Sequence, residues 1–511
     1  MFKAKRSFLP ILLVFPPAFF VLNKISGTDK NRSAITAFAS GGIHSMRTGA
    51  LFLAMLVFFS GCAIGPKYET PEMETPEHFR DLETTTIPDC MADVPWWKIF
   101  EDQALQALIR EALRNNYDLR AAAARVDEAR AFIGVERAAL LPQSDLVASA
   151  QRDRNSKVLY PSLDTLTSTY SGGFNTSWEV DLWGRLRQKV TSAKMQAFAM
   201  EEFRRGILIT LVADTAQAYF VLRSLDLELE IAQETLKIRK ETYNLFDQRQ
   251  KGGVASALDV AQAAGDMYDT EATIPGLQRK ITIQENRICL LLGRDPGPVK
   301  RGTAIADQKN LPTIPEAGLP AVLLKRRPDV IQAEYEIKSA NALVGAAVGE
   351  FFPKLDLVNF LGAAGRRPSD VFTGDKTYEW TLGGETTLPL FKGGKNVYEY
   401  KVVKAQWKRA AEQYKQTVVS AFTDVANALT DIRRLAEVRV AQEKQVKADR
   451  EAAKLSKARY EGGFSSYLEV LDAERRRFGS ETSLARTLGD QFVALANLYR
   501  ALGGGWQKEA Q

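Results

Sequence analysis

Residues 249–260 read RQKGGVASALDV, and residues 459–470 read RYEGGFSSYLEV. Both stretches contain a Gly-Gly pair, a serine four residues after the first glycine, and a Leu-acid-Val ending, at an offset of 210 residues. A pair of glycines is typical of a tight turn between helices, because glycine reaches positive φ without steric cost. The stretch therefore predicts two similar helical hairpins in one chain.

The repeat extends over most of the chain. Further matches occur at an offset of 211 residues, from Asp118, Ala122, Ala129, Gly134, Pro142, Asp145, Leu146 and Val147 to Asp329, Ala333, Ala340, Gly345, Pro353, Asp356, Leu357 and Val358. Units this long exceed solenoid repeats, which run to about 50 residues. We expect one body of two halves: an N-terminal extension and signal at 1–61, a mature N-terminal segment at 62–103, repeat 1 at 104–293, a linker at 294–317, repeat 2 at 318–503 and a tail at 504–511.

The composition argues against an enzyme and against a nucleic-acid-binding protein. The 511 residues carry a net charge of +6 with no basic block, so nucleic-acid binding has no support. Both histidines, His44 and His78, precede the repeats, and the three cysteines make neither a zinc pattern nor a CxxC pair. We expect Cys90 and Cys289 to be unpaired packing residues. We predict no catalytic residue, no metal site and no cofactor.

A lipoprotein export signal is predicted before the repeats. Residues 46–62 combine a basic start, a short apolar core and the ending Ser60-Gly61-Cys62. This ending resembles the bacterial lipoprotein box, which implies that Cys62 is acylated and becomes the mature N-terminus. The next residue, Ala63, differs from the aspartate that commonly retains lipoproteins at the inner membrane. The alternative is a buried cysteine ending a membrane helix, but the apolar run is too short to span about 30 Å.

The first 45 residues are a separate feature. A basic cluster and an apolar stretch at 8–22 resemble a second signal or anchor, but Pro10, Pro16 and Pro17 interrupt the stretch. We hypothesise that translation starts at Met46. Detection of residues 1–45 in the cell-made protein by N-terminal labelling would contradict this.

Apolar periodicity predicts the same order of elements twice. In the first copy we expect a helix at 104–141, strands at 143–151 and 173–182, and helices from 184 to 251 and from 258 to 292. In the second copy we expect a helix ending at 351, strands at 355–361 and 378–388, a turn at 392–394, and helices at 396–461 and 468–502. A helix of about 65 residues spans roughly 100 Å.

The long helices carry a coiled-coil seam. Apolar steps of four, three, four and three residues occur at Leu208, Val212, Thr215, Tyr219 and Leu222, and at Val418, Phe422, Val425, Leu429 and Ile432. Helices of this length are normally laid side by side in coiled coils or helical barrels. A surface helix of an ordinary domain is the alternative, but it rarely keeps such a seam over this length.

The predicted strands have the length of tilted membrane crossings. Strands of about 9–11 residues fit the bilayer, yet the smallest barrels have about eight strands. An open edge in lipid leaves backbone groups unpaired, so membrane-crossing strands would require an oligomer. Two functions remain open for the aromatic residues of this region: interfacial girdles, or simple packing in the core. They are Trp178, Trp183, Tyr378 and Trp380.

Five groups of residues resemble the TolC-like outer-membrane factors, in the lipoprotein branch that includes OprM and NodT. They are Gly61-Cys62-Ala63-Ile64-Gly65-Pro66-Lys67-Tyr68, Trp96-Trp97 with Phe100 and Asp102, Asp181-Leu182-Trp183-Gly184-Arg185, Arg326-Arg327-Pro328-Asp329-Val330, and the two Gly-Gly segments. The resemblance implies an α+β membrane protein: a homotrimer with a 12-stranded outer-membrane β-barrel and a 12-helix periplasmic α-barrel. It implies that the loops 153–171 and 362–377 face the outside of the cell.

The resemblance also implies a function and partners. Such channels passively export drugs or other small molecules in tripartite efflux systems, receiving them from an inner-membrane pump, here of the resistance-nodulation-division type, through a periplasmic adaptor. The alternatives are the exit duct of a type I protein secretion system and a periplasmic coiled-coil scaffold that never spans the membrane. The implied adaptor-contact tips are Gly252, Gly253, Ser256, Gly462, Gly463 and Ser466.

A gate is implied at the periplasmic tips. In the family, acidic residues after the second-copy tip line the aperture, and the matching positions are Glu469 and Asp472, spaced i, i+3 on one helix face. Tyr460 and Asp259 match the tyrosine and the acid of the closing network, whereas the arginine of TolC falls at Ser465. The first copy has Gln262 in place of Asp472, so the acidic pair occurs once. The alternative for these carboxylates is a solvated helix face.

Overall fold

The computed structural model describes residues 64–73, 99–159, 161–162, 164–308, 326–374 and 376–504. The predicted signal, Cys62, Cys90 and the Trp96-Trp97 pair lie outside these residues.

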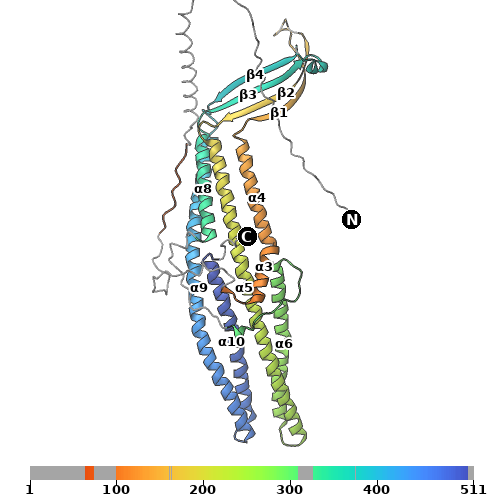
Figure 1. Cartoon of the computed structure of the whole chain (residues 1–511), viewed down its shortest axis with the longest axis vertical. Coiled ribbons are helices and arrows are strands. Elements are labelled where there is room, and N and C mark those ends of the chain that lie inside the picture. The colour runs from red at the N-terminus through yellow and green to blue at the C-terminus, as the bar shows by residue number, and fades with distance from the viewer. Residues whose placement is uncertain are drawn as a thin grey trace, which may run out of the picture. The chain divides into compact units, whose positions relative to one another are not determined.

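The same order of helices and strands occurs twice in the described chain (Figure 1). The first set consists of α3 (Gln103–Asn115), α4 (Tyr117–Ala138), β1 (Gln143–Arg154), β2 (Leu166–Val180), α5 (Arg185–Lys251) and α6 (Ala257–Leu292), followed by the short η2 (Ile305–Asp307). The second set consists of α8 (Pro328–Gly349), β3 (Lys354–Gly365), η3 (Pro368–Phe372), β4 (Tyr378–Thr387), α9 (Lys395–Glu461) and α10 (Tyr467–Ala501). The long helices α5 and α9 have 67 residues each, or about 100 Å of helix.

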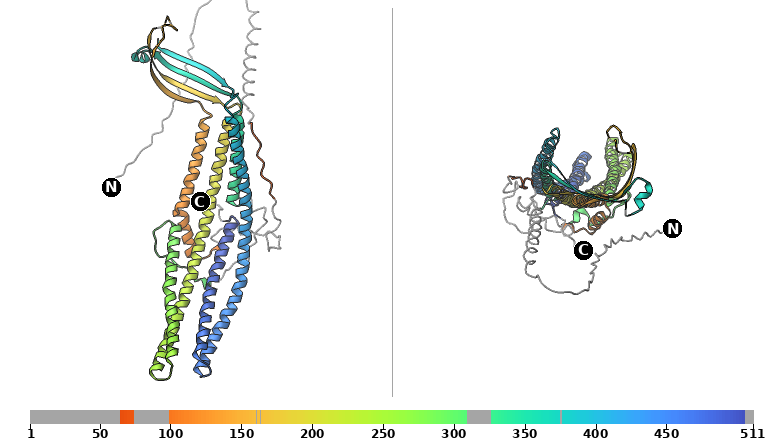
Figure 2. Two further views of the ribbon diagram at one scale, coloured as in Figure 1. Left: turned by 180° about the vertical axis from the view of Figure 1, so that it is seen from behind. Right: turned by 90° about the horizontal axis from the view of Figure 1, so that it is seen from above.

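The strands form one antiparallel sheet in the order β1-β2-β3-β4. Figure 2 shows the sheet, curved in the view from above, at the end of the helices where α4, α5, α8 and α9 meet it. The register places Leu146, Phe174, Leu361 and Trp380 in one row across the four strands. Pairing continues without a bulge, so each face of the sheet can be assigned residue by residue.

The prediction of a single helix over 104–141 is wrong. The helix is broken at Asn116, whose backbone is extended at ψ 130°. The Asn116 side chain accepts a hydrogen bond from the Leu119 backbone N–H at 2.9 Å and so begins α4. Its amide nitrogen also donates to the Leu291 carbonyl at 3.0 Å, which ties the break to the end of α6.

The first hairpin is longer than predicted. Pairing runs to Arg154 opposite Leu166, so the connecting loop is shorter than the expected 153–171. The polar residues of this part hide the alternation that marks a strand, although the ladder continues through them. Leu182, in turn, lies after the end of β2.

The turn from β2 into α5 is formed by the motif Asp181-Leu182-Trp183-Gly184-Arg185. Gly184 has φ 76°, and Gly394 has φ 83° at the start of α9, so both long helices begin after a left-handed glycine. The Asp181 carboxylate accepts from the Leu186 and Arg187 backbone N–H groups at 3.1 and 3.0 Å and satisfies the first turn of α5. The Arg185 guanidinium bonds Glu179 at 2.6 Å and Glu350 at 2.9 Å, joining the strand, the helix and α8.

The predicted seam lies in the helical core. In the main cluster, Val212, Tyr219, Val418 and Val425 are nearly inaccessible to solvent. An 18-residue stretch of α5 is apolar enough to cross a membrane, but 56% of that stretch is buried within the structure. Cys289 is a free, buried cysteine, as predicted. The apolar character of α5 is therefore explained by packing.

A pair of glycines in α10 tests how closely the helices pack. A Cβ on Gly489 would lie 2.7 Å from the Ser224 Cβ of α5, whereas a Cβ on Gly479 would meet nothing within 4 Å. Gly479→Ala is expected to stabilise the protein by up to about 1 kcal/mol through helix propensity. Gly489→Ala has the same gain in helix propensity, but its Cβ forces the helices apart at a cost of roughly 1–3 kcal/mol in the free energy of unfolding. Urea unfolding followed by circular dichroism should give a lower midpoint for Gly489→Ala than for Gly479→Ala, and equal midpoints would contradict the close approach.

Candidate functional site

The two helical hairpins end in nearly identical tips. Gly253 and Gly463 both have φ 77°, as their turns require. The expectation of positive φ is wrong for the first glycine of each pair, since Gly252 and Gly462 have φ −82° and −78°. The Val254 N–H bonds the Arg249 carbonyl at 2.8 Å, and the Phe464 N–H bonds the Arg459 carbonyl at 2.9 Å, so the two backbones follow the same path.

The serines of the tips begin the returning helices. Ser256 forms a capping box with Asp259, in which the Asp259 N–H donates to the Ser256 hydroxyl at 3.1 Å. Ser466 stands at the same position but its side chain makes no capping bond. Val254 and Phe464, next to the turns, are 82% and 79% exposed. The tips thus present a matched backbone with different side chains.

An apolar cluster joins the two hairpins just above the tips. The Phe246 ring of α5 lies 4.2 Å from the Tyr467 ring of α10 and 5.9 Å from the Tyr460 ring of α9, between centroids. Ala263, Val470 and Leu471 complete the buried group. Burial, together with the nearby Asp266 carboxylate, raises the pKa of Tyr467. The hairpins of the two copies are therefore one packed unit.

The predicted gate carboxylates lie on the surface of α10, each beside an arginine. The Glu469 carboxylate lies 3.7 Å from the Arg459 guanidinium, and the Asp472 carboxylate lies 2.8 Å from that of Arg476. Both carboxylates are more than half exposed. Sequence reasoning missed these arginines, which offset part of the negative charge at this level.

The other two predicted gate residues are not joined to each other by a hydrogen bond in the described part of one chain. The Tyr460 hydroxyl accepts a hydrogen bond from the Arg249 guanidinium at 3.2 Å. The Asp259 carboxylate instead accepts from the Ser256 hydroxyl at 2.7 Å, at the start of its own helix. Arg249 thus links α5 to α9.

A buried carboxylate, absent from the sequence-based prediction, connects the two copies above the gate. Asp266 of α6 is 5% exposed at its side chain, and its Oδ1 accepts from the Arg475 guanidinium of α10 at 2.6 and 3.0 Å. The Asp266 backbone carbonyl also accepts from Arg239 of α5 at 2.7 Å. Because a buried charge needs a partner, this pair constrains the position of α10 against α6.

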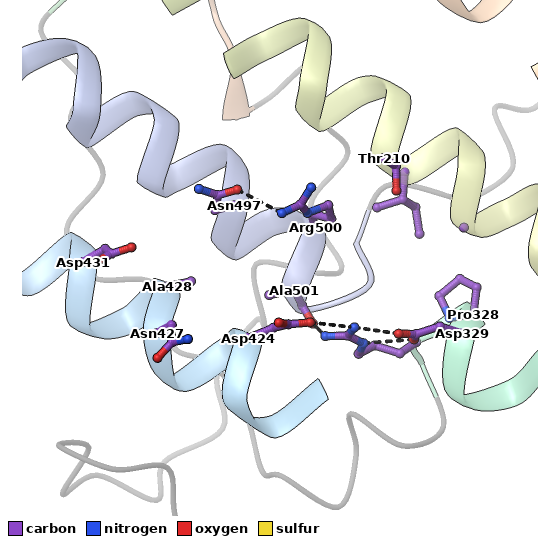
Figure 3. Close-up of a pocket in the computed structure, with 13 residues that line it drawn as sticks. Thr210, Pro328, Asp329, Asp424, Asn427, Ala428, Asp431, Asn497, Arg500 and Ala501 are labelled. Carbon is purple, nitrogen blue, oxygen red and sulfur yellow. Dashed lines mark hydrogen bonds and ion pairs between the residues drawn. The ribbon is translucent and has the colours of Figure 1, made fainter. Parts of the chain in front are cut away.

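A polar pocket of about 430 Å³ marks the middle of the helical body (Figure 3). Arg327, from the Arg-Arg-Pro-Asp motif, bonds Asp329 at 2.6 Å, Asp424 of α9 at 3.0 Å and the Ala501 carbonyl of α10 at 3.1 Å. Figure 3 shows Asp329 and Asp424 approaching from different helices, with Arg500 on a third. The motif therefore fastens the start of α8 to the end of α10, which is a structural function.

The two faces of the sheet differ in chemistry. On one, the row Leu146, Phe174, Leu361 and Trp380 is 75%, 53%, 41% and 63% exposed. We call this the apolar face; it also carries Val180, Leu355, Leu357, Tyr378 and Leu382. The other, the polar face, carries every acidic side chain of the strands: Asp145, Asp153, Glu179, Asp356, Glu379 and Glu385. Such alternation is typical of a membrane barrel, with lipid outside and water inside.

The aromatic residues considered for girdles separate into two groups. Trp178, Tyr378 and Trp380 lie on the apolar face of the sheet. Trp183 lies in the turn before α5, where its indole donates to the Pro353 carbonyl at 2.7 Å and its ring packs 5.0 Å from that of Phe352. Trp183 is therefore a packing residue.

The described N-terminal segment runs along α8 beside the sheet. The Ile64 N–H donates to the Trp183 carbonyl at 3.1 Å, and the Pro66 carbonyl accepts from the Asn341 amide at 3.0 Å. Gly65 lies against Gly345, where a Cβ would come within 2.8 Å of the Gly345 Cα. The segment that leads from Cys62 is thus fixed near the junction of strands and helices.

Comparisons with known proteins agree with this geometry. Residues 108–294 and 319–504 match the family model described as outer membrane efflux protein. The probable efflux pump outer membrane protein TtgC of Pseudomonas putida is 33% identical over 472 residues, which cover 91% of this chain and 97% of the relative. Cation efflux system protein CusC of Escherichia coli is 31% identical over 448 residues, covering 87% and 97%. The solved open state of the Neisseria gonorrhoeae MtrE outer membrane channel superposes with a TM-score of 0.78 at 32% identity, covering 88% of this chain and 100% of that one.

Adjacent arginines test the link between the copies. Arg475→Ala leaves the buried Asp266 carboxylate without its guanidinium partner and should destabilise the tip region by roughly 1–3 kcal/mol. Arg476→Ala removes only an exposed i, i+4 pair, worth about 0.5 kcal/mol or less. Hydrogen exchange of α6 and α10 amides near the tips should accelerate in the first variant and stay near wild type in the second. Equal exchange in both variants would show that Asp266 does not hold the hairpins together.

Proposed function

The chain belongs to the outer membrane efflux protein family, and we propose that three copies of it form one continuous duct across the outer membrane and the periplasm. The protein is an outer-membrane channel of an efflux system.

The trimer is proposed from the edges of the sheet. β1 and β4 have no strand partner on their outer sides within the described chain, and both are exposed along almost their whole length. In lipid each unpaired backbone group costs several kcal/mol, so β4 of one copy must pair with β1 of the next. Three copies supply the 12 strands and 12 helix positions that the family resemblance implies. The apolar face would then meet lipid, and the polar face would line the lumen.

The proposed gate is at the tips. Glu469, Asp472, Tyr460 and Asp259 line or brace the constriction, with Arg249 and Arg459 as partners within the chain. A ring of charged side chains at a narrow opening selects ions. The carboxylates of the polar face add negative charge higher in the duct. We therefore expect a cation-preferring channel that is narrow at rest.

The partners are proposed from the tip geometry. Gly252, Gly253, Ser256, Gly462, Gly463 and Ser466 would form the adaptor contacts, and the pump would be of the resistance-nodulation-division type. The names of the relatives refer to toluene, antibiotics and cations, so they agree on export and differ in what is exported. The protein itself provides a generic duct, and selection of the substrate belongs to the pump. The apolar face argues against a scaffold that never spans the membrane.

Single-channel recording tests the gate. The purified protein should open small, cation-preferring pores in planar bilayers. The double variant Glu469→Gln, Asp472→Asn leaves Arg459 and Arg476 without their carboxylates, so the cation preference should fall and the open conductance should rise. Glu437→Gln, an exposed carboxylate of α9 that also pairs with arginine, is the matched control and should behave as wild type. Unchanged selectivity in the double variant would place the gate elsewhere.

Acyl labelling tests the anchor. Two peptide steps separate Cys62 from Ile64, a span of about 7 Å at most, and Ile64 is bonded beside the base of the sheet. We propose that Cys62 carries the lipid and that the acyl chains enter the membrane there. Cys62→Ser should abolish incorporation of labelled palmitate, whereas Cys289→Ser, which changes a buried thiol, should retain it. Label that persists in Cys62→Ser would refute the assignment.

A further inference from the structure

A groove of about 660 Å³ lies against the apolar face of the sheet, towards the end farther from the helices. Its floor includes Leu146, Phe174 and Leu361, and its far wall is η3, with Val371 and Phe372. The lining is mainly apolar, and Phe372 is 88% exposed. The groove therefore offers an apolar slot on the surface that faces lipid in the proposed duct.

Two glycines let η3 lie directly on the sheet. A Cβ on Gly172 would be 3.0 Å from the Val371 Cγ1, and a Cβ on Gly365 would be 2.3 Å from the Asp370 Cβ. The segment is fixed at its start, where the Asp370 carboxylate accepts from the Arg367 N–H at 2.9 Å. The wall of the groove is thus built into the fold.

Arginines occupy the outer margin of the same face. The register places Ala148, Ala150, Arg152 and Arg154 in succession on the apolar face of β1. Of all the charged residues in the four strands, only Arg152 and Arg154 fall on this face; the others fall on the polar face. Both are exposed, and neither forms an ion pair with any residue that the structure describes. By contrast, Arg366 at the same end of the sheet pairs with Asp164 at 3.1 Å.

Distance along the strand places these arginines just above the groove. Gly172, under η3, pairs with Ala148, and Tyr170 pairs with both Ala150 and Gly365. Arg152 is the next residue of β1 on this face, about 7 Å further on, and Arg154 follows at a similar step. Two guanidinium groups that have no ion-pair partner among the described residues therefore stand at the headgroup end of an apolar slot.

We propose that this groove binds a phosphorylated glycolipid of the outer leaflet, with an acyl chain in the slot and its phosphates on Arg152 and Arg154. Guanidinium groups bind phosphate bidentately, and the low dielectric of the interface strengthens the contact. The opposite end of the sheet joins the helices (Figure 1), so in the proposed duct the arginine end lies at the headgroups of the outer leaflet. Two guanidinium groups two residues apart on one strand face match a headgroup that carries two phosphates. The inference rests on the proposed orientation of the sheet in the membrane.

Native mass spectrometry of the detergent-purified protein tests the proposal, with bis-phosphorylated lipid A as the probe. The variant Arg152→Gln, Arg154→Gln should bind lipid A roughly tenfold more weakly or worse, because both charge-assisted contacts to phosphate are lost. Arg366→Gln, the matched control at the same end, should bind as wild type. Equal binding by the double variant and wild type would overturn the proposal.

Lipid competition and a groove variant test the two halves of the ligand. Dephosphorylated lipid A and phosphatidylglycerol should both bind more weakly than lipid A, and equal binding of either one would overturn the assignment to a phosphorylated glycolipid. Val371→Asp should weaken lipid A binding by placing a charge in the slot, and unchanged binding would remove the acyl chain from the groove.

Conductance separates this inference from the proposed duct. The Arg152→Gln, Arg154→Gln variant should conduct as wild type, because both residues lie on the face away from the lumen. A protein that binds lipid A through these arginines but never conducts would refute the duct and leave the lipid site standing. A protein that conducts but shows no preference for lipid A would refute the lipid site and leave the duct standing.

Discussion

Among the described residues, the backbone groups along the outer sides of β1 and β4 have no strand partner, and this is the constraint on which the architecture depends. A four-stranded sheet with an apolar face cannot remain open in lipid, because no water is present to hydrogen-bond its edges. The sheet must therefore be closed into a barrel by strands from other copies of the chain. The closed barrel in turn determines how the helices below it are arranged. At the base of the sheet, Arg185 forms ion pairs with Glu179 and Glu350. These ion pairs fix the position of β2 relative to α5 and α8.

Below the sheet, the helices are held in place by a few polar contacts buried in an otherwise apolar seam. Arg327 fastens α8 to α9 and α10, and Asp266 receives Arg475 across the hairpins. Each is a charged group whose partner lies on another helix, so each specifies one arrangement of the helices where apolar packing alone would allow sliding. The gate residues differ from these, since Glu469 and Asp472 are more than half exposed and Asp472 pairs within its own helix. The tips are thus less constrained than the body above them.

Much of this arrangement could be predicted from the sequence, because periodicity and glycine turns are local signals. The bounds of α5, α6, α9 and α10 follow from the Gly-Gly tips and the seam to within a residue or two. The break at Asn116 was missed because it depends on the Leu291 carbonyl, which is distant in sequence. The outer part of the first hairpin was missed because serine and threonine do not alternate visibly.

The candidate site was predictable only where a family motif covered it. Arg249 is part of the repeated stretch but Arg475 is not, and their partners Tyr460 and Asp266 become neighbours only when the two hairpins pack. The separation of charged and apolar side chains between the two faces of the sheet follows from the sequence once the strand register is known, but the register itself comes from the structure. A shift of one residue would have moved every side chain to the other face.

The tips carry one further consequence. Gly253 and Gly463 give the two hairpins the same backbone, while Val254 stands where Phe464 stands in the other copy. In a trimer, six tips would therefore alternate around the axis in two chemical kinds with a common backbone shape. An adaptor ring of identical subunits would meet pseudo-sixfold geometry but only threefold chemistry. The binding surface of each adaptor subunit must then either contact only the backbone of the turn or accept valine and phenylalanine at the same position. The adaptor subunits would thus be quasi-equivalent in their contacts, as a consequence of the duplication within this chain.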